Sequence, residues 1–188
     1  ESIVLAGVAL SSLFSAGTMI IQYFASDTVK VAAVIFWTFG DLGRATWREI
    51  WILSILLIFS LGYFLYHRWD YNAIASGEDT AKSLGVKVEK IRLGGMFVAS
   101  LITAVTVSFL GVIGFVGLVS PHIARRIIGT DERYLIPAAS FMGALILLTA
   151  DTLSRVLISP QTLPVGAVTS FLGAPLFLYL LIKGDTKR

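Results

Sequence analysis

The sequence has no cysteine, only two histidines and few charged residues. Without cysteine, the chain cannot form disulfides, thiol nucleophiles or cysteine-ligated zinc sites. His67 and His122 stand on separate predicted elements with no acidic cluster beside either, so we predict no metal site and no cofactor. The sequence also lacks a Ser–His pair, a His-Glu-x-x-His run and a phosphate-binding loop, which argues against an enzyme such as an intramembrane protease or an ATPase.

The shortage of charge indicates a membrane protein. Charged residues make up 14% of the chain, against about 25% in soluble domains, and the mean hydropathy is +0.82. The net charge of +3 is compatible with a nucleic-acid partner. However, the basic residues stand at the ends of apolar runs, as they do in membrane proteins, so no nucleic-acid partner is predicted. The composition predicts an all-α, polytopic transmembrane helical bundle in contact with a lipid bilayer.

Long apolar runs locate the spans, because a spanning helix needs about 20 apolar residues. Full spans are predicted at 3–24, 50–66, 134–153 and 164–182, and a short interfacial or re-entrant helix at 31–39. The chain starts at Glu1, and its first span has no basic segment before it and is too long for a signal-peptide core. We therefore expect a genuine span and a chain that is part of a longer protein.

Residues 93–124 form a run of 32 residues without a charged side chain. As one helix this run would be about 48 Å long, well beyond a hydrocarbon core of about 30 Å, and it is short for two full spans. We predict a span that ends near Leu110, followed by a shorter, broken helix to Ile128. This broken helix either exposes backbone to a transport pathway or is a kink absorbed by packing. Its possible break points are Gly111, Gly114, Gly117 and Pro121.

The distribution of lysine and arginine predicts the orientation. The segments 67–92, 124–133 and 183–188 hold 11 of the 15 basic residues and are predicted to be cytoplasmic. The opposite side keeps Lys30, Arg44, Arg48 and Arg155. Both ends of the charge-free run then face the cytoplasm, so it must cross twice. The chain is thus predicted to have about six membrane elements, with both termini cytoplasmic.

The polar stretch 70–92 is predicted to contain a helix at 73–84 with a docking face. Ser76 can cap this helix, Glu78 and Asp79 favour its first turn, and Gly85 can end it. Glu78 and Lys82 are spaced as an i,i+4 pair. Three apolar residues fall on one face, which suggests that the helix docks against something. They are Ile74, Ala81 and Leu84.

Asp151 and Arg155 also have i,i+4 spacing, at the outer end of a predicted span. They form either a self-contained surface pair, which contributes little stability, or an arginine offered to an acidic partner outside. The residues alone leave these alternatives open.

Several ordered motifs resemble one family. The runs are Gly114-Phe115-Val116-Gly117-Leu118-Val119-Ser120-Pro121-His122-Ile123-Ala124-Arg125, Leu163-Pro164-Val165-Gly166-Ala167-Val168-Thr169 and Leu172-Gly173-Ala174-Pro175-Leu176-Phe177, with Ala150-Asp151-Thr152-Leu153-Ser154-Arg155 between the first two. Trp37-Thr38-Phe39-Gly40 and the polar segment 76–86 match as well. The chain resembles, over essentially its whole length, the C-terminal half of the FecCD-like permeases. These are the transmembrane subunits of type II ABC importers for iron–siderophore, haem or cobalamin.

The resemblance implies a transport permease of the cell (inner or cytoplasmic) membrane. Its subunit would have ten spans, of which the first four are absent from this chain, and would pair with a second permease subunit, identical or different. Separate ABC ATPase subunits would hydrolyse ATP, and an extracytoplasmic substrate-binding protein would deliver the ligand. The resemblance places ATPase docking in the 70–92 loop, binding-protein docking at Arg155, and the transport pathway along the first span and the short helix after it. The implied ATPase-docking residues are Glu78, Ala81, Lys82, Leu84 and Gly85. The candidate pathway residues of the broken helix are Gly114, Gly117 and Pro121.

Three rival functions need features that the sequence lacks or shows only weakly. An ion-coupled secondary transporter would need ionisable residues at mid-membrane depth, and no predicted span has one at its centre. An intramembrane enzyme would need a nucleophile–base pair or metal ligands. A non-transporting scaffold is disfavoured only by the broken helix and the docking loop.

Overall fold

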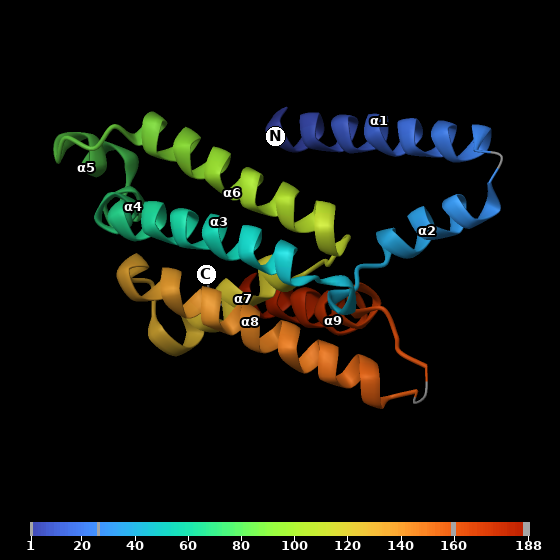
Figure 1. The fold of residues 1–188 in the computed structure, drawn as a ribbon. Helices are drawn as coiled ribbons and strands as arrows, with labels where there is room; N and C mark the ends of the chain where they lie inside the picture. Colours follow the sequence, from blue (N-terminus) through green and yellow to red (C-terminus); the bar gives the residue numbers. More distant parts are fainter. Residues whose placement is uncertain (1, 26, 159–160, 186–188) are drawn as a thin grey trace. The chain divides into compact units, whose positions relative to one another are not determined.

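The computed structural model describes residues 2–25, 27–158 and 161–185, and every regular element in these ranges is a helix (Figure 1). The chain forms two compact units, 1–38 and 39–188, which are described separately. The elements are α1 (Ser2–Phe24), α2 (Thr28–Thr38), a 3-10 turn η1 (Leu42–Arg44), α3 (Trp47–Tyr66), α4 (Arg68–Ala75), α5 (Glu78–Ser83), α6 (Val88–Leu110), α7 (Val116–Ile128), α8 (Glu132–Val156) and α9 (Val165–Asp185). The prediction of an all-α fold is confirmed.

The first unit contains the predicted span and the short helix that follows it. In α1, the hydroxyls of Ser11 and Thr18 donate to carbonyls three and four residues earlier, so these polar groups are satisfied within an apolar helix. The Asp27 carboxylate accepts from the Val29 amide at 3.0 Å, near the start of α2. With 11 residues, α2 is about 17 Å long and too short to cross a bilayer.

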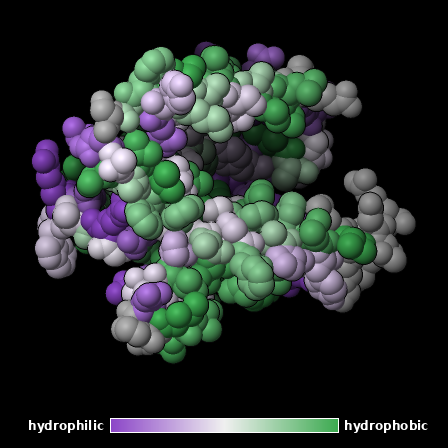
Figure 2. Space-filling model, turned by 90° about the vertical axis from the view of Figure 1, so that its right-hand side faces the viewer, coloured by the Kyte–Doolittle hydropathy of each residue, from purple (hydrophilic) through white to green (hydrophobic). Residues whose placement is uncertain are grey.

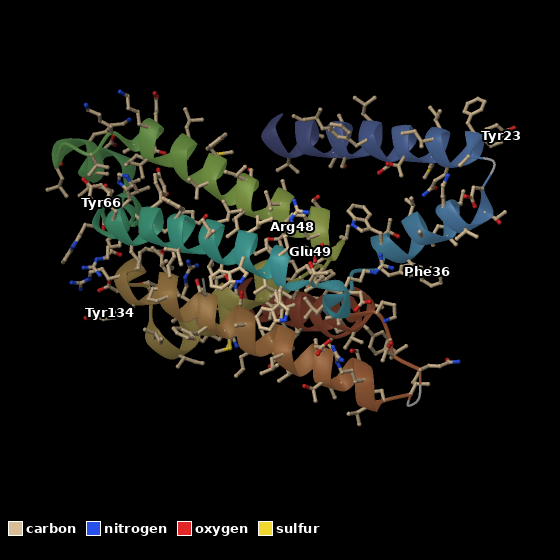
Figure 3. The ribbon with its side chains drawn as sticks, viewed as in Figure 1. Tyr23, Phe36, Arg48, Glu49, Tyr66 and Tyr134 are labelled. Atoms are coloured by element: carbon tan, nitrogen blue, oxygen red, sulfur yellow. The ribbon has the colours of Figure 1, made fainter. Side chains whose placement is uncertain are left out.

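The second unit holds the remaining spans and the polar segment between them. Taking both units together, four helices among the described residues are long and apolar enough to cross a membrane. They are residues 4–24 of α1 and the helices α3, α6 and α8. The helix α9 is apolar over Val165–Tyr179. At the start of α3 the Thr46 amide donates to the Glu49 carboxylate at 2.7 Å, and Figure 3 shows Glu49 at this end and Tyr66 at the other.

The charge-free run is broken as predicted, although not at every predicted point. The helix α6 ends at Leu110, residues 111–115 are not helical, and α7 begins at Val116. Gly111 has a φ of 77° and Phe115 a φ of 65°, so both turn the chain through the left-handed region. Gly117 and Pro121 are not break points, because both lie inside α7. A proline in the second turn of a helix removes one backbone hydrogen bond, and here the helix continues.

The polar stretch differs from the prediction of one helix at 73–84. It contains two short helices, α4 and α5, separated at Ser76 and Gly77. Ser76 ends α4 instead of capping the next helix. Gly77 has a φ of 123°, which residues with a side chain rarely adopt. At the corner between α3 and α4, His67 Nδ1 lies 2.7 Å from Asp70 Oδ2, which is a single acidic neighbour and not a cluster.

Hydrophobic side chains cover broad areas of the surface, while hydrophilic ones gather in patches (Figure 2). Large exposed aromatic residues mark both ends of the second unit's spans: Trp47 and Trp51 at one end, and Tyr66, Trp69 and Tyr134 at the other. Such girdles are typical of helices that cross a bilayer. The surface therefore agrees with the predicted membrane location of these helices.

Candidate functional site

The segment α4–α5, which we call the docking segment (residues 68–87), presents part of its predicted face. Leu84 is 69% exposed, and a side chain at Gly85 would meet open space. Gly85 ends the segment with a φ of 84° and donates to the Lys82 carbonyl at 3.0 Å. Ala81 is fully buried and its carbonyl accepts from the Val86 amide, so it supports the segment from within.

Glu78 has a different partner from the one that the spacing indicated. Its carboxylate forms an ion pair with Arg92 in the first turns of α6, not with Lys82. The hydrogen bond and the charge of Arg92 lower the pKa of Glu78. Both side chains are about half exposed, so this pair positions α5 against α6 and contributes little stability.

Two tyrosines pack against a glycine pair in α6, Tyr63 from α3 and Tyr71 from the docking segment. A Cβ added to Gly94 would collide with the Tyr63 hydroxyl, and one added to Gly95 would collide with the Tyr71 hydroxyl. The Tyr71 hydroxyl also lies 3.4 Å from the Ile91 carbonyl oxygen. Burial, and to a smaller extent Tyr63, raises the pKa of Tyr71 to about 12. This contact was not predicted, although the adjacent glycines in an apolar run were an available signal for it.

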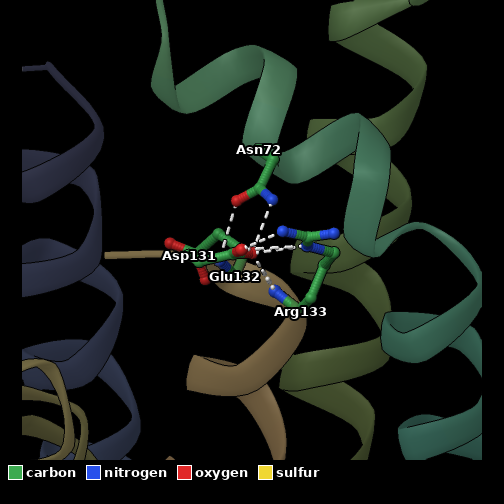
Figure 4. A network of polar contacts seen from close by, with 4 residues as sticks. All are labelled: Asn72, Asp131, Glu132 and Arg133. Atoms are coloured by element: carbon green, nitrogen blue, oxygen red, sulfur yellow. Dashed lines mark hydrogen bonds and ion pairs between the residues drawn. The ribbon is translucent and has the colours of Figure 1, made fainter. Parts of the chain in front are cut away.

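A polar network joins the docking segment to the start of α8 (Figure 4). Asn72 donates to Asp131 Oδ1 at 2.7 Å and accepts from the Glu132 amide at 2.7 Å. Asp131 also accepts from the Arg133 amide and guanidinium. Hydrogen bonds from Arg133, and then from Asn72, hold the pKa of the Asp131 carboxyl well below its usual range. None of these residues was predicted as a site residue.

At the opposite end of the second unit, three backbone segments cross at glycines. The Gly166 amide donates to the Gly40 carbonyl at 3.2 Å, and the Asp41 amide donates to the Leu110 carbonyl at 2.9 Å. A Cβ added to Gly166 would lie 2.6 Å from the Val112 carbonyl oxygen and closer still to that of Phe39. We call this crossing the glycine junction (residues 39–41, 110–113 and 165–166). It fixes the start of the break between α6 and α7.

The end of the break borders an apolar cavity of about 260 Å³ between α7, α8 and α9. Phe115, Thr149 and Thr169 are among its lining residues. Gly114 lies beside this region, where an added Cβ would sit 3.4 Å from Ser170 Oγ. Gly117 and Pro121 do not line this cavity.

Arg155 is paired within its own helix. Its Nε and Nη2 donate to the two carboxylate oxygens of Asp151 at 2.9 and 3.1 Å. The Arg155 side chain is 55% exposed, whereas that of Asp151 is 19% exposed. The guanidinium therefore keeps an open face beside its ion pair.

Within residues 2–25, 27–158 and 161–185, no group of three or more His, Cys, Asp or Glu side chains is placed to hold a metal ion. The described residues thus form a helical bundle with spanning helices, a polar docking segment at one end and a glycine junction at the other. This arrangement defines the chain as an all-helical, multi-pass membrane protein.

Comparison with known proteins identifies the family. Residues 1–183 match the model of the FecCD transport family, and the chain belongs to that family. It is 63% identical, over 97% of its length and 52% of the relative, to a protein of Methanocaldococcus jannaschii that carries the provisional name of an ABC transporter permease protein. It is 37% identical to the hemin transport system permease protein of Yersinia pestis, over 99% of this chain and 55% of the relative.

A solved structure shares the fold. It is an inward-facing conformation of a transporter provisionally described as a metal-chelate type ABC transporter. Its TM-score is 0.88 at 31% identity, covering 95% of this chain and 59% of that one. The chain spans about half the length of the curated relatives that it matches.

Proposed function

We propose that this chain contributes the transmembrane permease subunit of an ABC importer that takes up a metal chelate. The observation that carries the proposal is the match to the FecCD transport family over residues 1–183. Relatives of similar identity are named as permeases for hemin, Fe(3+)-citrate and iron(3+)-hydroxamate, and others for cobalamin and molybdate. The proposed substrate class is therefore a metal chelate, with iron–siderophore, haem and cobalamin as its members. ATP is hydrolysed on a separate subunit.

The docking segment is the proposed contact for that ATPase. Leu84 is exposed, and Gly85 stands beside it in open space, so both are available to a partner. Glu78 and Lys82 flank them as exposed charged residues, and Ala81 supports the segment from within. The proposed cytoplasmic position of this segment follows from its lysines and arginines.

Arg155 is the proposed contact for an extracytoplasmic substrate-binding protein. It lies at the end of α8 remote from Asp131 and Arg133, and its guanidinium is half exposed. A carboxylate of the partner would find an arginine already oriented by Asp151. The remaining proposed partners are a second permease subunit, identical or different, and the lipids of the cell membrane.

Transport in this proposal is a two-state movement of the helices, driven by closure of the ATPase against the docking segment. The proposed moving elements on the transport pathway are the break at residues 111–115, which includes Gly114, and the helix α7 after it, which contains Gly117 and Pro121. The glycine junction is a fixed crossing point from which α7 can tilt, since the backbone there is held by two hydrogen bonds.

A pull-down of the permease in detergent, with its ATPase and its binding protein, tests both contacts. Leu84→Arg adds charge and bulk at an exposed position and should release the ATPase alone. Gly85→Arg should do the same, and Gly85→Asn is its control because asparagine tolerates a positive φ without a large side chain. Arg155→Glu should release the binding protein alone, whereas Asp151→Asn, which leaves the arginine charged and exposed, should retain it.

The wild type decides between the importer and its rivals. If the wild type retains neither partner, the importer proposal is wrong, and a scaffold or secondary transporter becomes the working hypothesis. If both partners are retained but Arg155→Glu releases the ATPase as well, the assignment of the two faces is wrong.

A further inference from the structure

The docking segment is continuous in sequence with α3 and α6, and its side-chain hydrogen bonds also reach the start of α8, which is distant in sequence. Asn72, in the middle of α4, uses both ends of its amide (Figure 4). Its Nδ2 donates to Asp131 Oδ1 and its Oδ1 accepts from the Glu132 amide, each at 2.7 Å. The amide orientation is fixed because a backbone N–H can only donate and an ionised carboxylate can only accept.

Asn72 meets a carboxylate that is itself anchored. The Arg133 Nε lies 2.9 Å from both Asp131 oxygens, and the Arg133 amide lies 3.0 Å from one of them. The guanidinium of Arg133 stacks on the ring of Trp69, with its central carbon 4.4 Å from the ring centroid. Trp69 belongs to α4, so the network closes on the docking segment from two sides.

Of the residues that Asn72 and Trp69 contact, Asp131 belongs to the turn between α7 and α8, and Glu132 and Arg133 begin α8. This turn covers residues 129–131. Across it, Nη2 of Arg125 in α7 lies 3.8 Å from Oε1 of Glu132 in α8. The helix α7 packs along α8. With 13 residues, α7 is about 20 Å long, and its far end at Val116 follows Phe115, the last residue of the break, beside the apolar cavity.

We propose that Asn72 is a positioning residue that fastens the docking segment to the α7–α8 turn, so that the two move as one body. A displacement of the docking segment then moves the inner end of α7, and a short helix carries that movement to Phe115. Which partner supplies the displacement rests on the proposed function. The fastening itself does not, because it is a property of the permease alone.

The variants separate fastening from folding. Asn72→Ala removes both hydrogen bonds to the turn. Asp131→Asn is the conservative variant, since its amide oxygen can still accept from Asn72 and from the Arg133 amide. Ser76→Ala is the matched control: it lies at the end of the same helix, is exposed, and its hydroxyl donates only to the Asn72 carbonyl at 3.1 Å.

The first measurement uses the permease without its ATPase. Because the chain has no cysteine, spin labels can be placed at Leu84 and Thr130, both of which are exposed. Pulsed electron paramagnetic resonance should give one narrow distance in the wild type, Ser76→Ala and Asp131→Asn. In Asn72→Ala that single distance should be lost to a broad distribution. A distribution as narrow as that of the wild type would overturn the proposal.

The second measurement adds the ATPase and substrate in proteoliposomes. Asn72→Ala should bind the ATPase and hydrolyse ATP, but import about thirtyfold less substrate per ATP, the factor that corresponds to two net hydrogen bonds of about 1 kcal/mol each. Undiminished import per ATP would also overturn the proposal. If the wild type binds no ATPase, the proposed function fails, and the spin-label distances still decide the fastening. If Asn72→Ala does not fold to a monodisperse protein, Asn72→Asp replaces it, because it keeps the side-chain volume and places two carboxylates face to face.

Discussion

Replacing Gly166 by alanine tests the glycine junction, because two effects of opposite sign compete there. In an ordinary helix, glycine to alanine stabilises by up to about 1 kcal/mol. At Gly166 the new Cβ would lie 2.6 Å from the Val112 carbonyl oxygen and closer still to that of Phe39, whereas real Cβ atoms stay beyond 3.0 Å. Both obstacles are backbone atoms, so no side chain can rotate out of the way.

The helix must therefore move away from the junction by more than a few tenths of an ångström. The hydrogen bond from the Gly166 amide to the Gly40 carbonyl, already 3.2 Å long, then stretches beyond the normal range. Overpacking costs about 1–3 kcal/mol and a lost hydrogen bond about 0.5–1.5 kcal/mol. After the helix propensity is subtracted, Gly166→Ala should destabilise by about 2 kcal/mol.

Thermal unfolding in detergent, followed by tryptophan fluorescence, measures this difference. At 2–4 °C per kcal/mol for a chain of this size, Gly166→Ala should lower the unfolding midpoint by about 4–8 °C. Gly62→Ala is the control, because its Cβ in α3 would meet nothing within 4 Å, and it should leave the midpoint unchanged or raise it slightly. If the two variants shift the midpoint in the same direction by similar amounts, the close backbone crossing at the junction is refuted.

Two further predictions concern the end of the second unit that carries the docking segment. Gly95→Ala should destabilise the wild type by about 1–3 kcal/mol, because the new Cβ collides with the Tyr71 hydroxyl. In a Tyr71→Phe background the same substitution should cost little, because the nearest ring atom is 3.4 Å away. A thermal double-mutant cycle measures both costs, and equal costs in the two backgrounds would contradict this contact. Because the folded state holds the pKa of Asp131 below its ordinary value of 3.8, the Asp131 carboxylate stabilises the fold above 3.8, and this stabilisation is lost progressively as the pH falls from there toward the lower pKa of the folded state. The unfolding midpoint should therefore drop more steeply between pH 5 and pH 3 in the wild type than in Asp131→Asn, and parallel profiles would contradict the network.

The spans could be predicted because bilayer thickness limits the solutions. The run 93–124 is too long for one helix and too short for two, so its length alone predicts a break, which the structure places after Leu110. The boundaries were less certain: α6 begins at Val88, inside the stretch assigned to the polar loop. Charged residues extend a spanning helix into the interface without changing its hydrophobic length, so hydropathy cannot locate that end.

The contacts that build the candidate site could not be predicted, because they join distant parts of the chain. Asn72 and Asp131 are 59 residues apart, and each is ordinary in its local setting. The break between α4 and α5 had a local signal, Ser76-Gly77 before two acidic residues, but a continuous helix satisfied the same apolar spacing. Neither periodicity nor capping preference says which turn an asparagine will face.

If the charge-free run crosses the membrane twice, as predicted, the break between α6 and α7 supplies the length that the run lacks. The helix α7 spans about 20 Å, and the five non-helical residues before it add up to about 16 Å, which together exceed a hydrocarbon core of about 30 Å. Non-helical backbone at that depth is tolerated only where protein surrounds it. Here Leu110 and Gly111 are buried, and the Leu110 carbonyl, which the end of a helix would leave unpaired, accepts from the Asp41 amide. Gly40 and Gly166 are therefore required at the glycine junction. The backbone segments that cover the break and pair with its polar groups can approach it only where they carry no side chain.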